Sequence, residues 1–140
     1  MAILSIDYGK RKIGVAFSDE GESIAFVDKD LHIVNDNNLF ANLKEIVIEK
    51  RIDKLLVGLP YNNGSETAFT HEVRKFAKDF ANFIKQQYAI TLQVDFVDEI
   101  MTSRIGSQFI VQKRGKNKKV KKFDTKDDNF AAWVMLSAQL

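Results

Sequence analysis

The sequence predicts a mixed α/β fold in which a five-stranded sheet carries helices on both faces. Three short segments with strand-like composition follow one another near the N-terminus with only brief links, which is typical of an antiparallel start. Two later apolar strands are each reached through a segment with helical periodicity, and such right-handed crossovers make strands parallel. The predicted order of elements is β-β-β-α-β-α-β-α-α.

Two strands around one acidic residue open the chain. The apolar run 2–6 ends at Asp7, a turn containing Gly9 follows, and a second apolar run covers 13–17. Both runs are rich in β-branched or aromatic residues, so they predict a strand, a turn and a strand. Residues 22–34 alternate weakly in polarity and predict a third strand at an edge of the sheet, with a charged bend inside it.

Helices and strands alternate along the rest of the chain. Apolar residues at helical spacing predict an amphipathic helix over 38–50 and a longer one over 66–88, whose Phe stripe we assign to the core. Short apolar runs predict buried strands at 54–59 and 91–97. The remaining predicted elements are a loop at 61–65, a helix from 102 or 103 to about 112, and a final apolar helix from 127.

Composition indicates one globular domain, which we expect to span residues 1–140. The chain is 45% hydrophobic and 11% aromatic, enough to fill a core. No apolar run approaches the roughly 20 residues of a membrane span, and the N-terminus lacks the pattern of a signal peptide. There is no cysteine, which excludes disulfides, thiol catalysis and Cys-ligated zinc. We therefore expect a cytoplasmic protein with no membrane partner.

Positive charge gathers in a basic segment, residues 113–126, which holds eight of the 21 Lys and Arg residues. The rest of the chain carries more acids than bases. Such a segment often binds phosphate backbones, so it predicts contact with nucleic acid. A solvated loop is the alternative, and the two descriptions are compatible. The basic residues are Lys113, Arg114, Lys116, Lys118, Lys119, Lys121, Lys122 and Lys126.

Acidic residues stand at three places that this topology can bring together. Asp7 ends the first strand, Asp98 and Glu99 end the last strand, and Asp127 and Asp128 begin the last helix. Ligands of open α/β sheets bind at the carboxyl ends of strands. Grouped carboxylates repel one another unless a cation joins them, and Mg²⁺ or Mn²⁺ prefers such oxygen ligands. The pattern predicts metal-assisted phosphodiester hydrolysis; the alternative for Asp7 is that it only caps the turn.

Four blocks of the sequence resemble the motifs of one family, in matching order. They are residues 6–16, which contain Asp7 and Gly9, then 57–66, 97–102 and 128–132. Together they span nearly the whole chain. They resemble the YqgF/RuvX family, the Holliday-junction-resolvase-like nucleases of pre-16S rRNA.

The resemblance implies an RNase H-like fold and a metal-dependent endonuclease that matures the 5′ end of pre-16S rRNA. By position it implies that Asp7, Glu99 and Asp128 are the catalytic acids and bind Mg²⁺ or Mn²⁺, with Asp98 beside the middle one as a further metal ligand. The expected partners are RNA in ribosomal precursor particles, and DNA junctions as a second possibility. We expect a monomer or a weak homodimer.

Around these acids, the resemblance implies contacts with the substrate backbone. Gly9 and Gly58 are expected to let that backbone approach. The three cations that follow Gly9 are expected to meet phosphates together with the basic segment. Both histidines lie outside the four blocks and are assigned to the surface. The three cations are Lys10, Arg11 and Lys12, and the histidines are His32 and His71.

Several positions depart from the family pattern. Ile100 stands where the family usually has an arginine, which removes a cation near the predicted site. The loop after Pro60 is about one residue shorter than usual, and the basic segment before Asp128 is longer. Asp127 next to Asp128 leaves an alternative register for the last acid.

Three other functions fit parts of the sequence. A nucleic-acid-binding module without catalysis is favoured by Ile100 and opposed by the three retained acids. A Holliday junction resolvase would need a dimer, because two symmetric cuts require two active sites. Asp7, Gly9 and Gly14 also resemble the phosphate loop of sugar kinases and actin-like ATPases, but those proteins bind ATP between two such domains.

Overall fold

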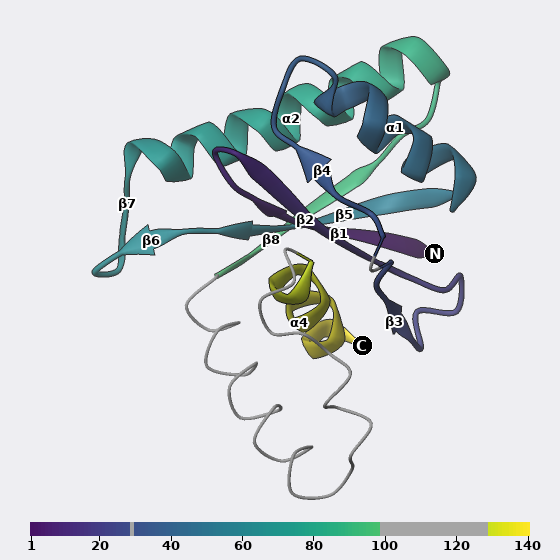
Figure 1. The fold of residues 1–140 in the computed structure, drawn as a ribbon, viewed down its shortest axis with the longest axis horizontal. Coiled ribbons are helices and arrows are strands. Elements are labelled where there is room, and N and C mark those ends of the chain that lie inside the picture. The colour runs from purple at the N-terminus through teal and green to yellow at the C-terminus, as the bar shows by residue number, and fades with distance from the viewer. Residues whose placement is uncertain (29, 99–128) are drawn as a thin grey trace, which may run out of the picture.

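The structure is a computed structural model that describes residues 1–28, 30–98 and 129–140. Its main sheet has the strand order β3-β2-β1-β5-β8 (Figure 1). The short strand β4 also pairs with β2, at the end of β2 opposite to β3. The strands of this sheet are β1 (Ala2–Tyr8), β2 (Lys12–Ser18), β3 (Ala25–Phe26), β4 (Ile33–Val34), β5 (Ile52–Leu59) and β8 (Gln93–Asp98). The other elements are α1 (Leu39–Glu49), β6 (Tyr61–Asn62), β7 (Ser65–Glu66), α2 (Ala68–Tyr88) and α4 (Phe130–Gln139).

The mixed sheet expected from the sequence is confirmed. β1 and β2 pair antiparallel, as do β2 and each of the short strands β3 and β4. β5 lies parallel to β1, and β8 lies parallel to β5. The antiparallel links are short, whereas α1 and α2 provide the crossovers that parallel strands need.

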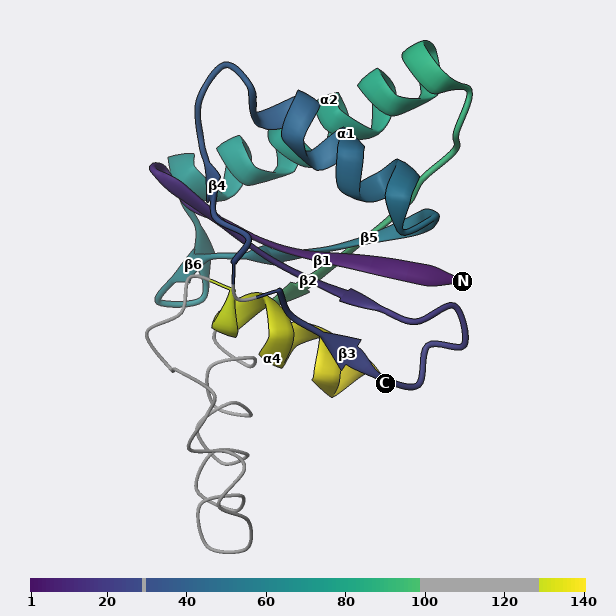
Figure 2. The same cartoon turned by 45° about the vertical axis from the view of Figure 1, so that its right-hand side comes forward.

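Helices cover both faces of the sheet, as predicted. Figures 1 and 2 show α1 and α2 on one face and α4 on the other. Because side chains alternate along a strand, β1 feeds two cores: Leu4 and Ile6 pack with α1 and α2, whereas Ile3 packs with α4. In the described part of the chain, no helix is long and apolar enough to cross a membrane.

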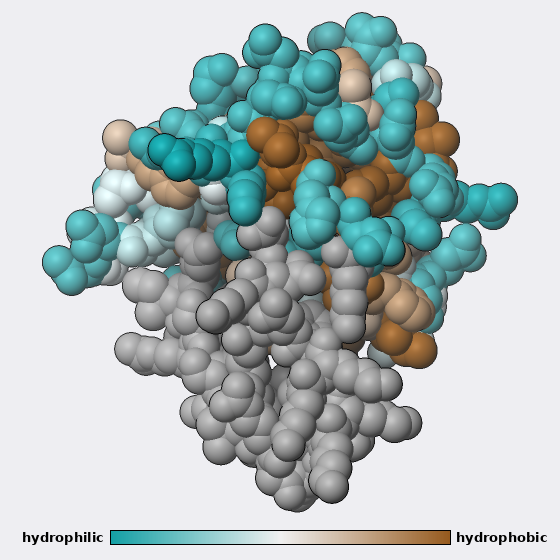
Figure 3. All heavy atoms as spheres, in the orientation of Figure 1, coloured by the Kyte–Doolittle hydropathy of each residue, from teal (hydrophilic) through white to brown (hydrophobic). Residues whose placement is uncertain are grey.

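The Phe stripe of α2 belongs to the core, as the periodicity indicated. Val73, Phe76, Phe80 and Ile84 are buried against the sheet and α1. Apolar side chains remain exposed elsewhere: Figure 3 shows a small apolar area over α1 and β4, elements that carry the exposed Ile48 and Val34.

Two elements differ from the prediction. The third strand, expected over 22–34, is divided into β3 and β4, so among the described residues the sheet has six strands in place of five. The segment expected as a loop after Pro60 contains the hairpin β6–β7, closed by Asn63 and Gly64, both with positive φ. This is the backbone of a type I′ turn, for which Asn-Gly is the favoured pair.

Candidate active site

Asp7 lies half-buried at the carboxyl end of β1, the middle strand of the sheet. The neighbouring side chains identify its face. Ser5 donates from Oγ to the Ala132 carbonyl of α4 at 2.8 Å, whereas Tyr8 packs on Phe76 of α2 with ring centroids 4.7 Å apart. Asp7 shares the face of Ser5, because alternate residues of a strand point the same way. Its carboxylate therefore lies on the α4 side of the sheet.

Asp98 reaches the same edge of the sheet as Asp7 but a different face. The carboxyl ends of the parallel strands β1, β5 and β8 meet at this edge, where Asp98 pairs with Leu59. Paired residues on adjacent strands share a face, and Leu59 belongs to the core beneath α1 and α2. Val97, the preceding residue, packs on the α4 side. Strand alternation thus separates the Asp98 side chain from that of Asp7.

The other two predicted acids, Glu99 and Asp128, lie outside the described residues, as do Asp127, Ile100 and the basic segment 113–126. Within residues 1–28, 30–98 and 129–140, no three His, Asp or Glu side chains come close enough to hold a metal ion. Both histidines are exposed, as expected. Of the four predicted metal ligands the described residues include Asp7 and Asp98, on opposite faces of the sheet, and hard carboxylate oxygens are what Mg²⁺ or Mn²⁺ prefers.

Asn129 fixes the start of α4 at the level of this edge. Its side chain is fully buried: Oδ1 accepts from the Val15 amide at 2.9 Å, and Nδ2 donates to the carbonyls of Asp28 and Leu31 at 3.2 and 3.0 Å. Val15 is paired with Ile6, the neighbour of Asp7. The first residue before α4 is therefore anchored to β2, the strand next to β1. The local sequence did not indicate this role of Asn129, because these three hydrogen-bond partners are distant in the chain.

The turn between β1 and β2 carries the predicted phosphate-binding cations. Lys10, Arg11 and Lys12 are exposed directly after the end of β1. Gly9 is required by the turn itself, because a Cβ there would overlap the Lys12 carbonyl oxygen. Asn35 closes the turn from the other side, donating from Nδ2 to the Gly9 carbonyl and from its backbone N–H to the Arg11 carbonyl, each at 2.8 Å.

Gly58 has a packing role in the structure, and its predicted role in substrate approach stays a prediction. It is buried within β5, and a Cβ there would lie 2.6 Å from Sδ of Met135 in α4. The absent side chain lets α4 lie close on the sheet. The sequence showed only a glycine near the end of an apolar run, which did not reveal that a helix some 77 residues later covers it.

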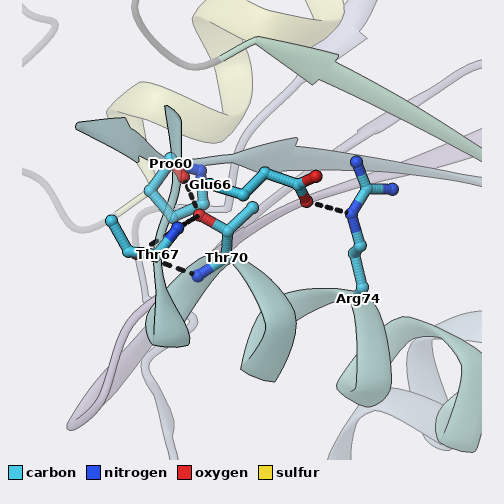
Figure 4. A network of polar contacts seen from close by, with 5 residues as sticks. All are labelled: Pro60, Glu66, Thr67, Thr70 and Arg74. Atoms are coloured by element: carbon cyan, nitrogen blue, oxygen red, sulfur yellow. Dashed lines mark hydrogen bonds and ion pairs between the residues drawn. The ribbon is translucent and has the colours of Figure 1, made fainter. Parts of the chain in front are cut away.

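A polar network holds the segment after β5 (Figure 4). Thr67 and Thr70 form a reciprocal capping box at the start of α2, and the Thr70 hydroxyl donates to the Pro60 carbonyl. Glu66 accepts from Nε of Arg74 at 2.6 Å. These contacts tie the hairpin and the first turns of α2 to the carboxyl end of β5. The second sequence block thus folds into a supporting structure at the edge where Asp7 lies.

Comparison with known sequences gives one consistent family. A family model described as "RuvX: Holliday junction resolvase" matches residues 1–140. A protein of Orientia tsutsugamushi (strain Ikeda) named "Putative pre-16S rRNA nuclease" is 32% identical over 139 residues, 99% of this chain and 82% of that protein. One of Karelsulcia muelleri (strain GWSS) with the same name is 32% identical over 120 residues, 86% of this chain and 82% of the relative.

Solved structures share the fold at low sequence identity. Thermus thermophilus RuvC in complex with a Holliday junction substrate superposes with a TM-score of 0.60 at 12% identity, covering 99% of this chain and 96% of RuvC. The fowlpox virus Holliday junction resolvase gives a TM-score of 0.51 at 16% identity, covering 99% and 97%. At such identities the likeness concerns the fold, and it confirms the RNase H-like architecture expected from the sequence.

Proposed function

This chain belongs to the RuvX family, and on that basis we propose that it is a metal-dependent endonuclease that hydrolyses phosphodiester bonds. The observation that carries the proposal is the position of Asp7. The acid of the first family block ends the middle strand, at the edge where the parallel strands β1, β5 and β8 finish. Ligands of open α/β sheets bind at such an edge. The names of the curated relatives support pre-16S rRNA as the substrate. The cut that we propose is at its 5′ end.

We assign the catalytic roles to Asp7, Glu99 and Asp128. Asp98 lies on the face opposite Asp7, which supports Glu99 as the acid of the third block that acts with Asp7. Asn129 is anchored to β2, the strand next to β1, and Ser5 of β1 donates to the Ala132 carbonyl of α4, which supports Asp128 as the acid that acts with Asp7 from the start of the last helix. Together these carboxylates suit Mg²⁺ or Mn²⁺, which when bound would polarise the scissile phosphate and promote deprotonation of the attacking water.

The cations of the β1–β2 turn are assigned to the phosphates beside the scissile bond. Lys10, Arg11 and Lys12 follow Asp7 within five residues and are exposed. Gly9 keeps the turn tight, because a Cβ there would overlap the Lys12 carbonyl oxygen. The basic segment 113–126 would add contacts along the strand that do not depend on sequence, because phosphate contacts carry no base information.

The remaining features of the proposed enzyme follow from its family and composition. We propose a single catalytic domain over residues 1–140 that acts on ribosomal precursor particles in the cytoplasm. The domain would work as a monomer or weak homodimer, because one domain contains all three proposed acids.

The test is cleavage of an end-labelled, 5′-extended 16S rRNA precursor fragment with Mg²⁺, with Mn²⁺ and with EDTA. Wild type is expected to cut only with a metal ion. Asp7→Asn is expected to lose at least about 10³-fold in rate, because loss of a catalytic group removes transition-state stabilisation.

Asp53→Asn is the matched control. Asp53 lies near the start of β5, at the opposite edge of the sheet, so the same chemical change there should leave the rate unchanged. Cutting by Asp7→Asn at the wild-type rate would refute the site. RNA binding without cutting by the wild type would favour the non-catalytic module.

Holliday junction resolution is the second candidate, favoured by the description of the matching family model. Two symmetric cuts would require a dimer that presents two Asp7 edges. A four-way DNA junction in the same assay separates the two substrates. Paired, symmetric cuts in the junction, by a protein that sediments as a dimer, would select the resolvase over the RNA nuclease.

A further inference from the structure

A pocket of about 560 Å³ opens between the start of α1 and the middle of α2. Tyr8 forms part of its wall, and Tyr8 is the chain neighbour of Asp7 on the other face of the sheet. The pocket therefore lies at the same edge as the proposed active site, across the thickness of the sheet. Nothing in the proposed cleavage chemistry uses it.

Aromatic rings line much of the pocket. Tyr8, Phe40, Phe76 and Phe83 all line it, with Phe40 ring centroids 6.1 Å from Phe76 and 5.4 Å from Phe83. Tyr8, Phe40 and Phe83 are only partly buried, so ring surface stays accessible. Aromatic rings are the usual platforms for unstacked nucleobases, at about 1–3 kcal/mol per base.

Carboxylates also line the pocket. Asp36, Glu72 and Asp79 line the pocket, and Asp79 is paired with Lys75 at 2.8 Å. Burial raises the pKa of the Tyr8 hydroxyl, and the negative charge of the Glu72 carboxylate raises it further, so this acid lies near Tyr8 in the pocket wall. Lys75 also lines the pocket, but the acids there outnumber this one base, so the surface favours N–H donors over phosphate. Guanine presents N1–H and N2–H₂ side by side on its Watson–Crick edge, a pair that one carboxylate can accept.

A residue of the pocket wall is hydrogen-bonded to the turn that carries Lys10, Arg11 and Lys12. Asn35, a wall residue, donates to the Gly9 carbonyl and to the Arg11 carbonyl, each at 2.8 Å. A strand whose phosphates follow residues 10–12 would therefore pass the pocket mouth within a few nucleotides of Asp7. Phosphate binding in the turn and base binding in the pocket are compatible with a single path of the strand over the sheet edge.

We propose that this pocket binds an unstacked guanine base of the nucleic-acid strand. The proposal deepens the nuclease function, on which it rests for the identity of the strand, by giving the enzyme a base preference near the cut. Base binding itself needs neither Asp7 nor a metal ion, so it can be measured separately from cleavage.

The experiment is an NMR titration of the ¹⁵N-labelled protein with 5′-GMP, 5′-IMP and 5′-AMP. The three nucleotides share the phosphate and ribose, so differences report the base, and IMP lacks only the N2 amine of GMP. We expect the largest amide shifts at residues 36–41 and 72–79, and about tenfold tighter binding of GMP than of AMP, with IMP between them.

Glu72→Gln should weaken GMP binding about tenfold and remove the preference over AMP, because an amide cannot accept both N–H groups as a carboxylate does. Glu45→Gln is the matched control, since Glu45 is exposed on α1 and does not line the pocket. If Glu72→Gln does not fold, the wild-type shift map and nucleotide order decide the question alone.

The failure of this proposal and that of the nuclease function are distinguishable. Asp7→Asn should bind GMP as wild type does, and GMP binding by a protein that cuts nothing would refute only the nuclease. Equal affinity for the three nucleotides, or shifts confined to the turn at 10–12, would overturn the guanine pocket. Preference for N-acetyl-arginine amide over GMP would overturn it too, in favour of a basic protein segment.

Discussion

At the scale of single residues, Asn129 is a fully buried polar side chain that connects distant parts of the chain. Its three hydrogen bonds reach residues that lie 98 to 114 positions away. Asn129→Ala would remove them and leave the buried amide of Val15 without an acceptor. We expect a loss of about 2–3 kcal/mol in the free energy of unfolding.

Urea unfolding monitored by circular dichroism measures this loss as a lower midpoint at an unchanged slope. Asn82→Ala, at an exposed position of α2, should stay within about 0.5 kcal/mol of wild type. Equal midpoints for the two variants would mean that the amide of Asn129 adds no net stability.

Asp7 and Asn129 show what the sequence could predict at this scale. Asp7 ends an uninterrupted strand pattern, so local reasoning found its place at the edge of the sheet. The residues around Asn129 in the sequence did not indicate its role, because its hydrogen-bond partners come from β2 and from the link between β3 and β4. The close contact of Gly58 with Met135 escaped prediction for the same reason: both contacts exist only once α4 lies on the sheet.

At the scale of elements, the start of α2 depends on a pair of threonines. The Thr67 hydroxyl oxygen accepts from the Thr70 amide, and the Thr70 hydroxyl oxygen accepts from the Thr67 amide. Thr67→Ala should cost about 1 kcal/mol of unfolding free energy, whereas Thr67→Ser should retain most of it, because serine keeps the accepting oxygen. Thermal or urea unfolding of both variants tests the cap. An equal loss of unfolding free energy in both would show that the γ-methyl group of Thr67, and not its hydroxyl, stabilises the helix start.

Helices and long strands were predictable, and short strands were not. The helix expected over 38–50 is observed at Leu39–Glu49, because periodicity integrates over many residues. Residues 22–34 were expected as one strand that pairs with β2. In the structure the pairing is interrupted between β3 and β4, where the Val15 amide of β2 donates to the Asn129 side chain. The β6–β7 hairpin had a local signal, Asn63-Gly64, which the sequence analysis read only as part of a loop.

At the scale of the whole molecule, the sheet edge of the candidate site was predictable but its face was not. Parallel strands bring Asp7 and Asp98 to one edge whatever the details of pairing. Which of two adjacent acids shares the face of Asp7 depends on a register with a period of two residues, and a shift by one position exchanges the faces. The sequence Asp98-Glu99 does not show which face Asp98 occupies, whereas its pairing with Leu59 places it on the face covered by α1 and α2.

Charge distribution leads to the last prediction, which concerns how the molecule holds a strand. If the basic segment binds phosphates, each contact should release counterions, and the logarithm of the RNA affinity should fall with the logarithm of salt concentration by about 0.7 per contact. Changing four of its lysines to glutamine should flatten that slope. The four are Lys118, Lys119, Lys121 and Lys122.

The control removes the same charge from the side of the molecule covered by α1 and α2. Its four changes to glutamine are at Lys44, Lys50, Lys78 and Lys85. Fluorescence anisotropy of a labelled RNA at several salt concentrations gives both slopes. A flatter slope in the first variant alone would mean that the segment contacts phosphates directly. The same change in both would mean that only net charge acts, because a uniform field does not depend on which lysines supply it. An unchanged slope in the first variant would identify the segment as a solvated loop.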